Sequence, residues 1–227
     1  MCAQERIALY GGTFDPVHTG HVEVARGVLQ LFEIEKVLFI PARMAPHKVG
    51  RPVTEPIHRY AMLALATQDE PRLSISTFEL EAPDRRYTVD TVERFQQVLG
   101  ASAELFFIMG ADSWSEITTW REWERLLSTA NHIVVTRPGY DPAATHVGAI
   151  GDRIVDLRDG KTPPRTLVGK KIFFTDVVMK DVSATSIRRL ASEGRVGELT
   201  GLIPGPVLEY IKKYGIYREL NEAKLNS

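Results

Sequence analysis

The sequence contains a single cysteine, Cys2, so an internal disulfide and a cysteine-rich zinc site are both excluded. It has no apolar run near the ~20 residues that a membrane-spanning helix requires, and its N-terminus carries no secretory pattern. A formal net charge of -1 argues against a protein that coats nucleic acid, because such proteins carry a basic surface. We therefore expect a cytoplasmic protein without a membrane or nucleic-acid partner.

The composition is that of a globular protein, with 44% hydrophobic and 25% charged residues. A length of 227 residues suits one domain, and we expect a single domain over 1–227. The stretch near 137–170 contains several prolines and little periodicity, so it is predicted to be an irregular excursion. The portion near 186–220 is predicted to be helical. The sequence leaves open whether the chain forms a homo-oligomer.

Short apolar runs alternate with helical patterns along the chain. The predicted strands are 7–10, 36–41, 72–76, 105–109, 132–136 and 171–175, and the predicted helices are 19–32, 55–68, 88–99, one from 186 and 204–214. This alternation is typical of βαβ units. We therefore predict an α/β fold, a doubly wound, Rossmann-like parallel sheet with helices on both faces. The residues expected to face inward are Ile57, Tyr60, Ala61 and Leu65 in one helix, and Val89, Val92, Phe95 and either Val98 or Leu99 in the next.

The most informative segment is 7–21, IALYGGTFDPVHTGH, in which an apolar strand ends at Gly11 and Gly12. The following helix is expected to begin at Thr19, which places His18 and His21 on one side of its first turn. A glycine-rich junction lets backbone approach a ligand, and a helix N-terminus offers free N–H groups and positive potential. The pattern is neither the G-x-G-x-x-G fingerprint nor a P-loop. It predicts a site for a nucleotide polyphosphate.

Further polar residues follow other predicted strands, where doubly wound sheets bind their ligands. The loop PARMAPHK carries His47 and Lys48, MGADSW carries Gly110 and Asp112, and SATSIR carries Ser183, Thr185, Ser186 and Arg188. If the fold is as predicted, these loops and the two histidines converge on one crevice.

Each of these features also has a simpler explanation. Two histidines could bind a metal, although no set of neighbouring ligands completes such a site, and either one could cap the helix or belong to the core. Asp112 could cap its own helix, and SATSIR alone is an ordinary helix start. The tryptophans Trp114, Trp120 and Trp123 are more typical of packing than of ligand stacking. The joint occurrence of the two histidines with Gly11, Gly12 and the SATSIR segment favours the ligand site.

The pattern GGTFDPVHTGH resembles the HxGH signature of the adenylyltransferase superfamily. The ordered set GGTFDPVHTGH, PARMAPHK, HRYAMLALA, YTVDT, MGADSW, Trp120, TRPGY and SATSIR is similar to bacterial nicotinate-nucleotide adenylyltransferases over most of 7–215. This resemblance implies adenylyl transfer from ATP to nicotinate mononucleotide, which releases pyrophosphate and makes deamido-NAD for NAD synthesis. It implies Mg²⁺ as a companion of ATP, held mainly by substrate phosphates, and no protein metal site.

The resemblance also implies which residues act. His18, His21 and Arg188 would be catalytic, and ATP would be bound by Gly11, Gly12, Thr13, Phe14, His18, His21, Gly110, Asp112, Ser183, Thr185, Ser186 and Arg188. Nicotinate mononucleotide would be bound by Lys48, Thr88, Trp120, Arg121 and Arg137. The chain departs from the family pattern at Ala184, where a hydroxyl is usual, so this side chain cannot bind phosphate.

Two other functions stay open at this point. One is a related adenylyltransferase that acts on nicotinamide mononucleotide or pantetheine phosphate, although the pantetheine enzymes carry threonine in place of His18. The other is a non-catalytic nucleotide sensor with the same fold. The intact histidine pair argues against a sensor, because a module that only binds nucleotide has little use for two imidazoles at the phosphates.

Overall fold

The computed structural model describes residues 4–43, 53–82, 87–136, 148–177 and 182–218. Its strands are β1 (Glu5–Gly12), β2 (Lys36–Pro41), β3 (Leu73–Ile75), β4 (Ala103–Gly110), β5 (Asn131–Val135), β6 (Ile154–Asp156) and β7 (Ile172–Thr175). Its α-helices are α1 (Thr19–Leu31), α2 (Pro56–Thr67), α3 (Thr88–Leu99), α4 (Ala111–Ser115), α5 (Trp123–Thr129), α6 (Ala184–Ser192) and α7 (Gly205–Tyr214). Short 3₁₀ turns are η1 (Gly100–Ser102), η2 (Ile117–Thr119), η4 (Gly148–Arg153) and η5 (Val196–Leu199). All predicted strands and helices are present.

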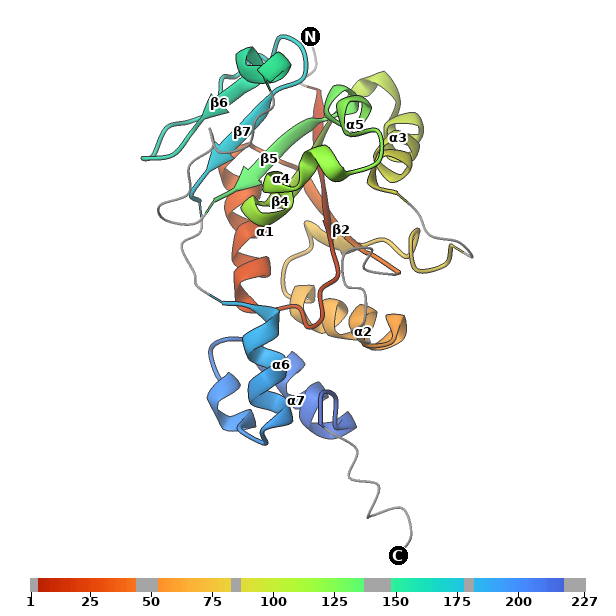
Figure 1. Cartoon of the computed structure of the whole chain (residues 1–227), viewed down its shortest axis with the longest axis vertical. Coiled ribbons are helices and arrows are strands. Elements are labelled where there is room, and N and C mark those ends of the chain that lie inside the picture. Colours follow the sequence, from red (N-terminus) through yellow and green to blue (C-terminus); the bar gives the residue numbers. More distant parts are fainter. Residues whose placement is uncertain (1–3, 44–52, 83–86, 137–147, 178–181, 219–227) are drawn as a thin grey trace, which may run out of the picture.

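The described strands form one parallel sheet in the order β3-β2-β1-β4-β5-β7-β6 (Figure 1). The chain winds from β1 toward β3 in one direction and from β4 toward β6 in the other. The direction therefore reverses between the neighbouring strands β1 and β4. Ligands of such sheets bind at this reversal, outside the carboxyl ends of the strands.

The sheet is buried on both faces, as the alternation along β1 shows. Ala8 and Tyr10 belong to a core that α1, α2, α6 and α7 cover. Ile7 and Leu9 belong to a second core that α3, α4 and α5 cover. The predicted doubly wound architecture is therefore confirmed. Figure 1 shows α6 and α7, in blue, beyond one end of the sheet, and α7 packs against α2. No helix in the described part of the chain combines the length and apolarity that a membrane crossing needs.

The predicted inward face of the second helix is right at Leu65, which packs against the first core, and wrong at Ile57. Ile57 is 65% exposed, whereas the residues of α2 that are fully buried are Arg59, Met62 and Leu63. The buried stripe was missed because it includes a charged residue, which a search for apolar periodicity excludes. In α3 the structure decides between the two alternatives, since Val98 is 65% exposed and Leu99 packs against the second core.

The stretch predicted to be irregular contributes a strand in its described part. Ile154–Asp156 forms β6, which pairs in parallel with β7 at the edge of the sheet. A strand of three residues is too short to show periodicity, and only its pairing with β7 stabilises the extended backbone. Residues 137–147 of the same stretch lie outside the described part of the chain.

His132 on β5 connects the core to the pH dependence of stability. Its side chain is fully buried and packs beside Phe107, with ring centroids 5.9 Å apart. Burial lowers the pKa of His132 from 6.5 to about 3. The unfolded chain therefore takes up a proton below about pH 6.5 that the folded chain excludes, so stability falls as the pH falls.

We expect this histidine alone to cost ~2 kcal/mol of unfolding free energy between pH 7 and pH 5. His132→Leu removes the titrating group, so its unfolding free energy, measured by urea denaturation, should fall less steeply over that interval than that of the wild type. The comparison uses the two pH slopes, because the substitution also changes packing. Equal slopes would contradict a neutral, buried His132.

Candidate active site

The loop after β1 (residues 13–18, here the β1–α1 loop) brings the two histidines together. His18 is the N-cap of α1, with extended backbone at φ -135° and ψ 171°. Its ring stacks on that of His21, with centroids 3.6 Å apart and planes 23° apart. His18 is 7% exposed and His21 is half-buried. The sequence prediction that both lie at the first turn of the helix is confirmed.

A backbone hydrogen bond sets the proton position on His21. The N–H of His18 donates to Nδ1 of His21 over 3.2 Å. An accepting Nδ1 carries no proton, so in this ring the proton is on Nε2, which is then a donor. The pair therefore offers hydrogen-bond donors, beside the positive end of α1.

Two glycines of the motif have little room for a side chain because of the rings around them. A Cβ at Gly12 would lie 2.8 Å from Cζ of Phe14, and a Cβ at Gly20 would lie 3.1 Å from Nδ1 of His18. Phe14 itself has a φ of 50°, an unusual backbone conformation for a bulky residue. Its buried ring packs edge-on to that of His21, at 5.1 Å between centroids. The ring of Phe14 thus packs against the imidazole pair on its buried side.

The SATSIR segment reaches the same loop from the C-terminal portion. Ser183 caps α6, since its Oγ accepts the N–H of Ser186 at 3.1 Å. Arg188 donates through Nη1 to the backbone oxygen of Asp15 at 2.6 Å and through Nη2 to Oγ1 of Thr185 at 3.2 Å. Ser183, which was predicted to cap the helix or to bind phosphate, is therefore the cap of α6. The structure brings Arg188 to the β1–α1 loop, 173 residues away in the sequence.

Gly110 and Asp112 lie at the neighbouring strand end. Gly110 ends β4 and is the N-cap of α4, and Asp112 follows in the first turn of that helix. Both residues are exposed. Because β4 pairs directly with β1, they flank the same reversal of the sheet as Gly11 and Gly12.

The predicted acceptor residues in the described part of the chain lie together at the start of α3. The Arg121 guanidinium lies over the ring of Tyr87, 4.5 Å from its centroid, and Thr88 is the first residue of α3. Trp120 packs against the core on this face. The other two predicted acceptor residues, Lys48 and Arg137, lie outside the described residues, as does His47.

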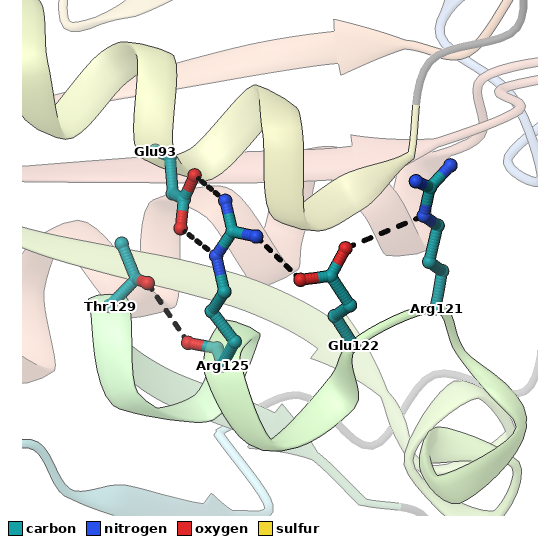
Figure 2. A network of polar contacts seen from close by, with 5 residues as sticks. All are labelled: Glu93, Arg121, Glu122, Arg125 and Thr129. Atoms are coloured by element: carbon teal, nitrogen blue, oxygen red, sulfur yellow. Dashed lines mark hydrogen bonds and ion pairs between the residues drawn. The ribbon is translucent and has the colours of Figure 1, made fainter.

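A network of ion pairs holds this segment in place (Figure 2). Arg125 of α5 makes a two-pronged contact with Glu93 of α3 and a 2.5 Å contact with Glu122. Glu122 also lies 3.5 Å from Arg121, and the hydroxyl of Thr129 donates to the backbone of Arg125 at 2.9 Å. The Arg125 guanidinium holds the pKa of Glu93 below its ordinary value. Exposed pairs add little stability singly, but this set joins α3 to α5 beside the Trp120–Arg121 segment.

Sequence reasoning missed Arg59, a buried residue that bonds to the backbone of three segments around the site. Arg59 of α2 is fully buried and donates to the backbone oxygens of Thr54 at 2.8 Å, Thr13 at 2.9 Å and Arg43 at 3.2 Å. Burial lowers its pKa, and the charge of Asp15 opposes that shift. The sequence offered one signal of this role, which is that Arg59 lies at the start of the apolar run in HRYAMLALA.

The described residues contain no group of three or more histidines, cysteines, aspartates or glutamates that could hold a metal ion. The arrangement therefore consists of hydrogen-bond donors, a helix N-terminus and an arginine, gathered at a strand end. Such a site can orient a polyphosphate and stabilise charge that develops on its oxygens.

Comparison with known proteins finds relatives that match most of the chain. The model of the cytidylyltransferase-like family matches residues 9–190. Curated relatives include a "Probable nicotinate-nucleotide adenylyltransferase" of Thermoanaerobacter sp., 39% identical over 96% of this chain and 96% of its own. A relative of the same name from Symbiobacterium thermophilum is 39% identical over 93% of this chain and 95% of its own.

A solved structure also shares the fold. It is the Plasmodium falciparum nicotinic acid mononucleotide adenylyltransferase complexed with NaAD, which matches with a TM-score of 0.72 at 19% identity over 94% of this chain and 97% of that chain. At this identity the likeness concerns the fold alone. The family model and the curated relatives together show that this chain belongs to the cytidylyltransferase-like family and, within it, to the nicotinate-nucleotide adenylyltransferases.

Proposed function

We propose that this protein transfers the adenylyl group of ATP to nicotinate mononucleotide, which yields deamido-NAD and pyrophosphate for NAD synthesis. The observation that carries the proposal is the stacked pair of His18 and His21 at the start of α1, with Arg188 bonded to the same loop. The names of the curated relatives support the choice of acceptor. The chain would act as one catalytic domain, because α6 of the C-terminal portion supplies Arg188.

The reaction needs positioning more than acid or base catalysis. A phosphate oxygen of the mononucleotide attacks the α-phosphorus of ATP, and the bond to the bridging oxygen breaks as pyrophosphate leaves with the electron pair. The nucleophile is already an anion, so no strong general base is required. The reaction is accelerated by alignment of the two phosphates and by stabilisation of charge on the leaving group.

The residues divide these tasks. Nε2 of His21 donates to the reacting phosphate, the N–H groups at the start of α1 receive its oxygens, and Arg188 binds the leaving phosphates. Gly110 and Asp112 would bind the adenosine side. We propose that Mg²⁺ enters as part of the ATP substrate, held by phosphate oxygens, as is usual for this ion at nucleotide sites.

His21→Asn tests the role of the Nε2 donor. The asparagine oxygen can still accept the N–H of His18, whereas the donor toward substrate is lost. We expect kcat to fall by roughly 10²–10³, the usual effect of removing one preorganised donor, while ATP still binds in calorimetry. His58→Asn, on α2, serves as the control, because His58 contacts Tyr210 rather than the β1–α1 loop. A wild-type rate in the His21 variant would make this histidine a helix cap only.

Arg188→Lys tests the forked contact. Lysine keeps the charge, but it cannot donate to Asp15 and Thr185 while it also faces phosphate. We expect kcat/KM for ATP to fall by roughly tenfold to a hundredfold in a pyrophosphate-release assay. The matched control is Arg189→Lys, since Arg189 is an exposed neighbour on α6 that lies 3.8 Å from Glu193. Equal kinetics of the two variants would contradict a role of Arg188 in binding the ATP phosphates.

The choice of acceptor is tested with nicotinate mononucleotide, nicotinamide mononucleotide and pantetheine phosphate in the same assay. Glu116, Glu122 and Glu124 are exposed, and Glu122 is paired with Arg125, so these carboxylates do not oppose an acidic ring substituent. We expect kcat/KM to favour the acid over the amide at least about tenfold, which requires ~1.4 kcal/mol of differential binding. Equal turnover of the amide would overturn the acceptor assignment. Absence of pyrophosphate release with every acceptor would favour a nucleotide sensor.

A further inference from the structure

The C-terminal end of the described chain returns to the β1–α1 loop. Tyr217 lies just beyond α7, and its hydroxyl donates to Oδ1 of Asp15 over 2.7 Å. Asp15 is 5% exposed, and the two residues are 202 positions apart in the sequence. Tyr217 has a φ of 69°, a left-handed conformation that non-glycine residues adopt rarely. The contact therefore joins the C-terminal end of the described chain to a buried carboxylate of the β1–α1 loop.

Asp15 joins the C-terminal segment to the rest of the site. Its Oδ2 accepts the N–H of Thr54 at 3.2 Å, and its backbone oxygen accepts Nη1 of Arg188 at 2.6 Å. One oxygen of the carboxylate therefore accepts a hydrogen bond from the segment before α2, and the other accepts one from Tyr217. Rotation of this carboxylate would disturb both contacts, and movement of its backbone would displace the partner of Arg188.

The start of α1 is also attached to the C-terminal portion. The backbone N–H of Thr19 donates to the oxygen of Leu202 at 3.0 Å, and its hydroxyl donates to the same oxygen at 2.9 Å. The β1–α1 loop is thus held at Asp15 and again immediately after His18. Both attachments come from the C-terminal portion, which therefore helps to hold the loop together with Arg59 and Thr54.

Tyr217 remains a donor over the whole physiological range. Burial raises the pKa of its hydroxyl well above the ordinary value, and the nearby charge of Asp15 raises it further. The hydroxyl therefore stays protonated. A phenylalanine at this position would keep the ring and its packing against the first core and would leave Oδ1 of Asp15 without this donor.

We propose that Tyr217 is a positioning residue, which acts through Asp15 to fix the β1–α1 loop and the contact that aims Arg188 at the ATP phosphates. This inference rests on the proposed adenylyl transfer for the identity of the substrate. Tyr217 itself need not touch substrate. Its effect on the reaction passes through the orientation of Asp15.

The test compares Tyr217→Phe with Tyr210→Phe. Both variants lose one tyrosine hydroxyl from the C-terminal portion, but Tyr210 bonds to His58 of α2, at 2.8 Å, and not to the loop. We expect Tyr217→Phe to lower kcat roughly tenfold and to weaken the binding of a non-hydrolysable ATP analogue roughly fivefold, because a hydrogen bond to a charged group is lost. Tyr210→Phe should change neither quantity. The Tm of each variant separates these effects from a general loss of stability.

A double-mutant cycle with Asp15→Asn tests the pathway. If Tyr217 acts through Asp15, adding Tyr217→Phe to Asp15→Asn should lower kcat by less than twofold, since the interaction is already weakened. Additive losses, or a Tyr217→Phe variant whose kcat and ATP-analogue affinity match those of Tyr210→Phe, would overturn the inference. A wild-type protein that binds the analogue but adenylylates no acceptor would overturn the proposed function instead, while the comparison of affinities would still decide the role of Tyr217.

Discussion

The buried guanidinium of Arg59 is the interaction on which the active-site end of the sheet depends. It donates to three backbone oxygens, one each from the β1–α1 loop, the segment after β2 and the segment before α2. Loop backbone that leaves a sheet has no ladder partners, and buried carbonyl groups without donors are costly. One arginine donates to all three, so it ties the loop to the two neighbouring segments even though the loop contains no regular secondary structure.

The shape of this loop is what makes the proposed chemistry feasible. Because Thr13 is held by Arg59 and Asp15 is bonded to Arg188, the loop enters α1 with His18 and His21 stacked at the helix start. A reaction between two anionic phosphates is accelerated mainly by alignment and by donors that need no reorganisation. In the proposed reaction the loop contributes by aligning the phosphates, and no acid–base pair is required because the nucleophile is already an anion. At the proposed acceptor side, ion pairs between α3 and α5 hold the segment around Trp120 (Figure 2).

Most of the fold was predictable from the chain. Strands such as β4 and β7 are continuous apolar runs, and the helices show the expected periodicity, because burial on both faces of a parallel sheet imposes these patterns locally. Prediction failed where the pattern was short or interrupted. β6 has only three residues, and the inward face of α2 includes the charged Arg59. The choice of Leu99 over Val98 depended on how α3 packs against its neighbours.

The sequence by itself determined the strand-to-helix junction at 11–19, the cap at Ser183 and the two histidines on one helical turn. These features follow from glycine conformation, capping and helical spacing, which act over a few residues. Only the tertiary structure decided that Arg188 and Tyr217 both reach Asp15, across 173 and 202 positions. Such contacts result from the packing of the C-terminal helices against α2 and the start of α1. They leave no local pattern, because each partner alone looks like an ordinary polar residue near a helix end.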